Sequence, residues 1–235
     1  WEPEEQASNL VQLRTDMIGS LSTFDLREVK SWQRPAGSDK FQFDSDYQRY
    51  AVSDAEGTIQ IRTVKDNQLI HELIGKGKPA WKLMFSPKGL YLAAKFHDAS
   101  IAMASIRVWN ATTGEMVYQD SGLHINDYAF SCDDCKFANC NPDGNIQVFS
   151  MDRLEDPPIV LESEFWPSSL FFRPDGVELA AAEKFDEGKI ELWNLAERSS
   201  RLINPESAVY SVAWNPDNDR IAMGCTDGVI RIWDV

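Results

Sequence analysis

The sequence predicts an all-β protein built from repeated four-stranded sheets. Three observations support this fold class: apolar residues alternate as in strands, Gly- and Asp-bearing turns separate the runs, and the pattern repeats along the chain. The last residues show the unit most clearly, because an apolar run from Ile221 ends at Thr-Asp-Gly and a second run then alternates from Val229 to Trp233. Asp-Gly between two such runs is a strong hairpin signal, since glycine accepts a positive φ at no steric cost.

Five segments superpose without gaps around a strand–turn–strand pattern. They are FQFDSDYQRYA (41–51), LMFSPKGLYLA (83–93), YAFSCDDCKFA (128–138), LFFRPDGVELA (170–180) and VAWNPDNDRIA (212–222). Each contains an anchor aromatic residue, and these are Phe43, Phe85, Phe130, Phe172 and Trp214. Successive anchors are 42, 45, 42 and 42 residues apart. Each segment ends in a large apolar residue followed closely by alanine, so the five matches share one register.

A third strand and, in most repeats, a short fourth strand follow each segment. The third strands are EGTIQIR (56–62), SIRVW (105–109), DGNIQVF (143–149), EGKIELW (187–193) and DGVIRIW (227–233). The fourth strands are Leu69–Leu73, Met116–Gln119, Ile159–Leu161 and Arg201–Ile203. Four short antiparallel strands at this period are typical of a propeller blade. We therefore expect blades at about 38–75, 79–121, 124–162, 166–204 and 207–235.

The turn and third-strand motifs resemble those of the WD-repeat β-propeller family. FSPKG (85–89) and FRPDG (172–176) match the family's first turn, and IRVWN, IELWN and IRIWD match its third strand. The resemblance covers about residues 24–235 and implies five four-stranded blades, either as a complete ring or as part of a larger propeller. The family's Gly-His dipeptide is absent, and Arg62 and Phe149 replace the strand tryptophan. These departures predict blades held together mainly by apolar packing.

Residues 1–22 differ from the repeats and predict a short N-terminal helix or linker, with the helix over roughly 4–19. Residues 24–33 read as a single strand, and its part 27–33 could complete the last blade and close a five-bladed ring. The alternative is that the chain is cut from a longer protein. In support of that alternative, LRTDMIGSLSTFDLREVKSW (13–32) resembles the segment before the propeller of large bacterial serine/threonine kinases. No kinase motif lies in these 235 residues.

Charge and composition restrict the partners that we expect. The chain has 23 Lys and Arg against 37 Asp and Glu, a net charge of −14. Such a surface repels phosphate groups, so we expect neither nucleic acid nor an anionic membrane as a partner. No apolar run is long enough to span a bilayer, and the first residues do not form a signal peptide. We therefore expect a cytoplasmic protein.

Three motifs could bind metals or phosphate, but each has a simpler interpretation. Cys132, Cys135 and Cys140 have zinc-like spacing, yet they fall on a first turn and a second strand of one repeat, which favours structural thiols over a metal site or a redox pair. GKGKP (75–79) lacks the spacing of a phosphate loop. Asp44, Asp46, Asp217 and Asp219 lie in turns, where such residues suit the backbone. We expect no metal, no cofactor and no catalytic residue.

The repeat register also identifies candidate partner-binding positions. Four residues before each anchor aromatic lie Asp39, Trp81, Asn126, Ser168 and Tyr210. The family resemblance places this position at the channel rim, on the face usually used for partners. Trp81, Tyr210 and nearby Trp166 are aromatic residues of the kind that dominate interfaces, although they could instead pack between blades. The insertion His97–Ser105 in the second repeat is either a contact loop or a longer hairpin.

These features predict a non-catalytic module that binds protein or peptide partners, or regulates a larger chain. This prediction is a fold-level analogy. Two alternatives remain open. One is an enzyme or ligand-binding propeller that uses its central channel, although no His falls in the channel positions. The other is a structural spacer in a multidomain, kinase-linked protein. The charge and repeat patterns do not determine the oligomeric state.

Overall fold

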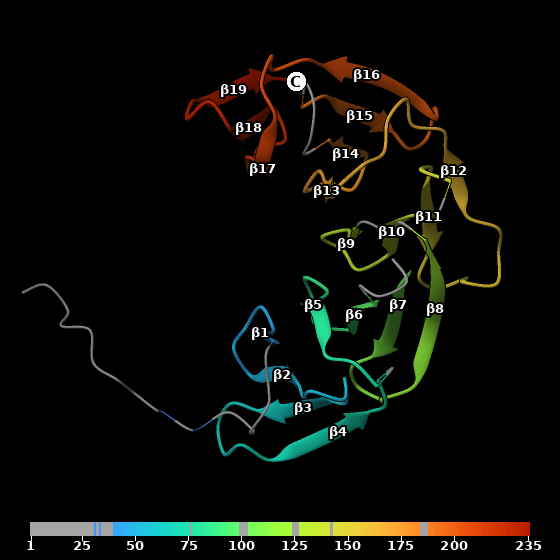
Figure 1. Ribbon diagram of the computed structural model, residues 1–235, viewed down its shortest axis with the longest axis vertical. Helices are drawn as coiled ribbons and strands as arrows, with labels where there is room; N and C mark the ends of the chain where they lie inside the picture. The colour runs from blue at the N-terminus through green and yellow to red at the C-terminus, as the bar shows by residue number, and fades with distance from the viewer. Residues whose placement is uncertain are drawn as a thin grey trace, which may run out of the picture. The chain divides into compact units, whose positions relative to one another are not determined.

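The strands form five antiparallel sheets that follow one another in chain order (Figure 1). The computed structural model describes residues 31, 33, 40–75, 77–98, 103–123, 127–141, 143–183 and 188–235. Residues 35–235 form one unit and residues 1–34 another. All the strands described below belong to the unit 35–235, and each sheet corresponds to one predicted blade.

The strands of each blade have the following bounds. Blade 1 contains β1 (Lys40–Phe43), β2 (Arg49–Ser53), β3 (Ile59–Thr63) and β4 (Leu69–Leu73). Blade 2 contains β5 (Ala80–Phe85), β6 (Tyr91–Asp98), β7 (Met103–Asn110) and β8 (Met116–Leu123). Blade 3 contains β9 (Tyr128–Phe130), β10 (Lys136–Cys140), β11 (Ile146–Ser150) and β12 (Ile159–Leu161). Blade 4 contains β13 (Ser169–Phe172), β14 (Glu178–Ala182), β15 (Ile190–Asn194) and β16 (Ser199–Ile203). Blade 5 contains β17 (Val209–Trp214), β18 (Arg220–Cys225) and β19 (Ile230–Asp234).

The all-β prediction and the repeat register are confirmed. Within each sheet the strands pair in sequence order, and the first four sheets have four strands each. The fifth sheet has three strands among the described residues, so β19 is an edge strand there. Of the predicted strand Arg27–Gln33 only Ser31 and Gln33 are described, and the N-terminal helix lies outside the described residues. Both stay predictions.

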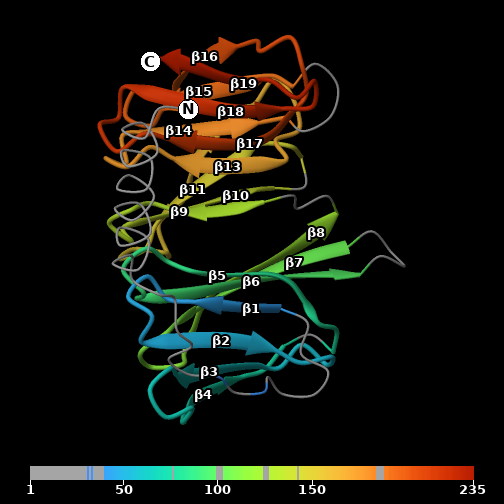
Figure 2. The same ribbon diagram turned by 90° about the vertical axis from the view of Figure 1, so that its left-hand side faces the viewer.

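The insertion in the second repeat lengthens a hairpin. Strands β6 and β7 pair from Tyr91↔Asn110 as far as Asp98↔Met103, and β8 pairs with β7 to Leu123. Figure 2 shows β7 and β8 extending past the strands of the neighbouring sheets. This finding favours the longer-hairpin interpretation of His97–Ser105 for the part of the insertion that is described.

Successive sheets pack face to face, and their apolar cores join neighbouring blades (Figure 2). One core combines Ile59 and Ile61 of blade 1 with Leu83 and Phe85 of blade 2. The predicted large apolar residue of each segment is buried in all five blades: Tyr50, Leu92, Phe137, Leu179 and Ile221. A blade with a neighbour on each side therefore buries apolar side chains on both faces of its sheet.

Buried polar side chains also connect the blades. The sequence predicted mainly apolar packing between blades and did not indicate these polar contacts. Asp134 of blade 3 accepts hydrogen bonds from the hydroxyl of Ser86 and the backbone N–H groups of Lys88 and Leu90 in blade 2. Arg49 of blade 1 donates to the carbonyl of Gly89 in blade 2 over 2.7 Å. Polar bonds of this kind orient one blade relative to the next.

The turn before the third strand requires glycine because the next blade comes close. Gly57 and Gly188 have φ of +82° and +72°. A Cβ at Gly57 would lie 2.0 Å from the carbonyl oxygen of Lys78, and one at Gly188 would lie 2.2 Å from that of Ser207. These oxygens belong to the connections that lead into the following blades. Two signals, positive φ and close approach, thus explain the recurring Gly of the sequence motif.

Candidate partner-binding site

Four blades line a cavity of about 370 Å³ along their first strands. Its wall is mostly apolar and includes Met84, Phe130, Phe171 and Trp214. These side chains come from the innermost strand of blades 2 to 5, so the cavity follows the channel side of the sheets. Its volume lies in the range of ordinary ligand sites, which combine an apolar wall with few polar groups.

One ion pair supplies the charged groups of this cavity. Lys82 Nζ lies 2.6 Å from Asp127 Oδ1, while the backbone N–H of Leu170 donates to Asp127 Oδ2 over 3.1 Å. Asp127 therefore links blade 2 to blade 4 through blade 3. The Lys82 ammonium also lies 4.6 Å from the centre of the Tyr128 ring. This ring is fully buried, and its hydroxyl donates to the carbonyls of Lys82 and Ala93.

A second lysine lies beside this ion pair. Lys95 on β6 is the cross-strand neighbour of Lys82 on β5. Burial lowers the pKa of Lys95, the Asp127 carboxylate raises it, and the Lys82 ammonium lowers it further. In the other blades the repeat position of Lys95 holds Ser53, Cys140, Ala182 or Gly224. Blade 2 thus places a partly buried cation where the other blades have small side chains.

The aromatic residues predicted for the rim are largely exposed. Trp81 is 67% exposed and Tyr210 is 66% exposed, and each precedes cavity-lining residues on its strand. The Trp81 ring lies 5.9 Å from that of His97. Trp166 is also exposed in part, but its indole lies against Gly144 in the neighbouring blade. Packing between blades, the alternative to a rim position, therefore describes Trp166 better than Trp81 or Tyr210.

Of the three polar residues predicted for the rim, the structure describes Ser168 only. The backbone N–H of Ser168 donates a hydrogen bond to the carbonyl of Ala182 over 2.9 Å, and its hydroxyl donates to the same carbonyl over 3.0 Å. Ser168 therefore extends the pairing of β13 with β14. Asp39 and Asn126 are outside the part of the chain that is described. Sequence reasoning missed Lys82, Lys95 and Asp127. A comparison of the first-strand and second-strand positions across the five repeats could have found them, because Lys95 departs from the small residues of its position.

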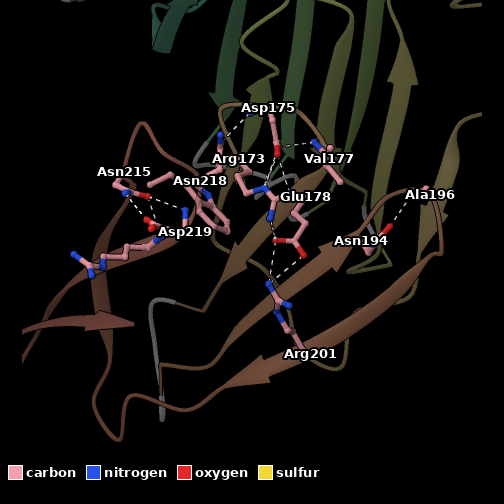
Figure 3. A network of polar contacts seen from close by, with 12 residues as sticks. Arg173, Asp175, Val177, Glu178, Asn194, Ala196, Arg201, Asn215, Asn218 and Asp219 are labelled. Atoms are coloured by element: carbon pink, nitrogen blue, oxygen red, sulfur yellow. Dashed lines mark hydrogen bonds and ion pairs between the residues drawn. The ribbon is translucent and has the colours of Figure 1, made fainter. Parts of the chain in front are cut away.

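A charged cluster at the first turns of blades 4 and 5 is a second candidate (Figure 3). The Arg173 guanidinium lies between Asp175 and Glu178, and Arg201 reaches Glu178 from β16. The hydrogen bonds from Arg173 hold the pKa of Asp175 below its usual value. The backbone N–H of Asp175 donates to Asn218 Oδ1 in blade 5 over 3.1 Å. The charged and polar groups of this cluster pair with one another, so we assign the cluster a structural role in the packing of blade 4 on blade 5.

The other predicted turn motifs also have structural roles. Asp44 accepts bonds from the backbone N–H groups of Gln48 and Arg49 and from the Arg49 guanidinium. In the GKGKP segment, the carbonyl of Gly75 accepts from Arg107. Among the described residues, no group of three or more His, Cys, Asp or Glu side chains is placed to hold a metal ion. The described residues also contain no helix long and apolar enough to cross a membrane.

The cysteines divide into two pairs of different reactivity. Cys132 and Cys135 are exposed, whereas Cys140 and Cys225 are buried. Burial raises the pKa of Cys140 to about 12. Desolvation and the Asp133 carboxylate also raise the pKa of Cys132 and of Cys135, so exposure is what distinguishes the two pairs. We expect iodoacetamide at pH 8 to label Cys132 and Cys135 slowly in the folded protein, and the other two only after unfolding. Peptide mass spectrometry of a labelling time course measures this, and rapid labelling of Cys140 in the folded chain would contradict the assignment.

Comparisons with known proteins agree with this geometry. The family model for the WD domain, G-beta repeat, matches residues 197–234. The chain is 28% identical to WD repeat-containing protein VIP3 of Arabidopsis thaliana, over 56% of the chain and 46% of that relative. It is 27% identical to small ribosomal subunit protein RACK1y of Oryza sativa subsp. japonica, over 56% of the chain and 41% of that relative. The chain thus spans less than half the length of these two relatives.

A solved structure confirms the architecture. The β-propeller domain of Cps50 (Swd1) from Myceliophteria thermophila superposes with a TM-score of 0.68 at 13% identity, covering 88% of this chain and 69% of that one. The successive antiparallel sheets, with a cavity along the first strands of four of them, therefore have the architecture of a β-propeller. The matched repeat and the WD-repeat relatives support a WD-repeat family for this propeller.

Proposed function

We propose that the chain is a non-catalytic platform that binds a protein or peptide partner through the channel cavity and the aromatic rim beside it. The observation that carries this proposal is the cavity of about 370 Å³, with its apolar wall and its Lys82–Asp127 ion pair. The exposed Trp81 adjoins Lys82 on the same strand. An apolar anchor with a few oriented polar groups at its edge is the composition of a binding hot spot.

The rigidity of the sheets supports binding of a partner in a preformed site. The cavity residues lie on strands, and the ion pair is fixed by bonds to three blades, so little ordering is needed on association. The net charge of −14 favours proteins over nucleic acids as partners. The relative RACK1y is named as a protein of the small ribosomal subunit, so it is a component of a larger assembly, which fits a platform role.

A peptide-display experiment tests this proposal. The immobilised chain is panned against a random peptide library, and the Kd of an enriched peptide is measured by fluorescence anisotropy. We expect Trp81→Ala to weaken binding by about tenfold or more, because truncating a hot spot typically costs about 2 kcal/mol or more. Met84→Glu, inside the cavity, should weaken it further. Met116→Ala, an exposed apolar change on the outer strand β8, is the matched control and should leave Kd unchanged.

Two outcomes would contradict the proposal. One is a library that yields no enriched peptide. The other is a peptide that binds the Trp81 and Met84 variants as tightly as the unchanged protein. The finer proposal, that the platform regulates a larger chain such as a bacterial serine/threonine kinase, is supported by the resemblance of residues 13–32 alone. Co-purification of a kinase domain with the native protein would test it.

The second candidate function is binding of a small ligand in the channel. The cavity volume favours it, because about 370 Å³ is enough to hold a small organic molecule against the first strands. A thermal-shift screen of small molecules against the chain distinguishes this candidate. A compound that raises Tm in the unchanged protein, but not in Met84→Glu, would support it over the peptide platform.

A further inference from the structure

The channel positions of the blades carry more lysine than acid, although the chain as a whole is acidic. The third residue before each anchor aromatic lies on the first strand or directly before it, and in blades 1 to 5 this register position holds Lys40, Lys82, Asp127, Ser169 and Ser211. Lys95 on β6 adds a third lysine, as the cross-strand neighbour of Lys82. Three lysines thus accompany one aspartate in a chain whose net charge is −14.

Within the ion pair of the cavity, the ammonium is the more accessible member. The side chains of Lys82 and Asp127 are 35% and 12% exposed. Both carboxylate oxygens of Asp127 already accept a hydrogen bond, one from Lys82 and the other from the backbone N–H of Leu170. An ammonium has three donors, and the described residues supply two acceptor atoms for Lys82: Asp127 Oδ1 over 2.6 Å and the carbonyl oxygen of Tyr128 over 3.3 Å. The charged group that can take a further partner is therefore Lys82, and a partner of opposite charge is an anion.

Apolar side chains form the wall beside this ammonium. Met84 lies two residues after Lys82 on β5, so the two side chains lie on the same face of the sheet, and both line the cavity. Phe130 of blade 3 and Phe171 of blade 4 belong to the same wall. Blades 2, 3 and 4 each share a core with a neighbour on either side, so the position of these residues is fixed by packing on both faces. Apolar surroundings lower the local dielectric constant and strengthen the attraction of the ammonium for an anion.

The net charge of the chain opposes an anionic ligand only at long range. Exposed charges are largely screened beyond about 8 Å at physiological ionic strength, whereas a carboxylate bound to Lys82 is in contact with the ammonium. Most of the residues that line the cavity are apolar, so a ligand that carries one negative charge among apolar groups matches the wall better than a highly charged ligand does. A peptide with an acidic side chain between large apolar side chains has this composition.

We propose that the cavity selects a peptide segment in which an Asp or Glu side chain is flanked by large apolar residues. The carboxylate of the peptide accepts a hydrogen bond from Lys82, and its apolar side chains pack against Met84, Phe130 and Phe171. This inference rests on the proposed function and specifies the chemistry of the partner. The bound carboxylate becomes a third acceptor for the ammonium, so Asp127 keeps its bonds to Lys82 and to Leu170.

Peptides enriched on the immobilised chain test the selectivity. We expect their sequences to share an acidic residue between aromatic or large aliphatic residues. Each selected peptide is synthesised with an amidated C-terminus, once as selected and once with the acidic residue replaced by the corresponding amide, Asn or Gln. The Kd of each form is measured by fluorescence anisotropy. We expect the amide form to bind about tenfold more weakly, because a charge-assisted hydrogen bond to Lys82 is lost.

Three variants identify the partner of the carboxylate. Lys82→Met keeps an unbranched side chain without the charge, so the acidic and amide forms should bind it equally, to within about twofold. Lys82→Arg restores a cation and should restore the preference for the acidic form. Lys65→Met removes an exposed lysine of blade 1 that does not line the cavity, and it should keep the preference of the unchanged protein. Circular dichroism confirms that each variant is folded, and the comparison of the two peptide forms on the unchanged protein needs no variant.

The outcomes separate this inference from the proposed function. Peptides that lose affinity for Met84→Glu but bind the unchanged protein as tightly in the amide form would overturn the selectivity and leave the platform standing. The same holds for a preference for the acidic form that persists in Lys82→Met. If a free C-terminus strengthened binding and the acidic side chain did not, the carboxylate would come from a chain end, which also overturns the inference. A library without any enriched peptide would overturn both proposals.

Discussion

Replacing Phe137 by alanine is expected to lower the free energy of unfolding by about 3–5 kcal/mol. Phe137 on β10 is fully buried, and its ring lies 5.1 Å from that of Phe130 and 5.3 Å from that of Tyr118. Tyr118 belongs to blade 2, so the ring fills the core between two blades. Alanine would leave a cavity there that strands on both sides prevent from closing.

Urea denaturation followed by circular dichroism measures this loss. Phe137→Leu keeps most of the buried volume and should cost clearly less than the alanine variant. Met116→Ala removes an exposed side chain from the same pair of blades and should change stability by about 0.5 kcal/mol or less. A loss under about 1 kcal/mol for Phe137→Ala would show that the core between blades 2 and 3 is not packed as described.

Replacing Asp134 by alanine is expected to cost about 3 kcal/mol, although the residue lies in a turn. The side chain is buried, and it accepts bonds from the hydroxyl of Ser86, from Lys88 N–H over 3.0 Å and from Leu90 N–H over 3.2 Å. Alanine would leave these donors of blade 2 without their acceptor. Asp134 also has φ of +60°, a conformation that alanine adopts with strain.

Two further variants separate the lost bonds from the strain. Asp134→Gly removes the acceptor and relieves the strain, whereas Asp134→Asn keeps one acceptor oxygen and tolerates positive φ. We expect stability to decrease in the order unchanged protein, Asn, Gly, Ala, as measured by thermal unfolding. If the Gly variant were as stable as the unchanged protein, the bonds between blades 2 and 3 would not contribute.

The repeat pattern was enough to predict the sheets and most of the core. Phe137 was predictable because it occupies the large apolar position that precedes alanine in its segment, and that position is buried in all five blades. The bounds of β12 and β4 also agree with the predicted fourth strands. These features depend on local alternation and turn chemistry, which a sequence displays directly.

The contacts between blades could not be predicted in the same way. The sequence showed Asp134 only as a turn residue, yet its carboxylate reaches a turn 44 to 48 residues earlier in the chain. Such pairing depends on how two sheets are placed against each other. The register identified Trp81 as a rim candidate, with packing between blades as the alternative. The ion pair of Lys82 and Asp127 was not predicted, because the two residues belong to different repeats.

The cores described above each join one blade to the next, and this arrangement has a consequence for how the unit loses its structure. A blade between two neighbours is held on both faces, whereas blade 5, among the described residues, is held through β17 and β18 on one face only. In a chain of modules coupled to their nearest neighbours, unfolding begins at the module with the fewest couplings and then spreads. Among the described residues, blades 1 and 5 each share a core with one neighbour, so they are expected to lose their structure first, and a surface that covers Ile230 and Ile232 would raise the cooperativity of unfolding.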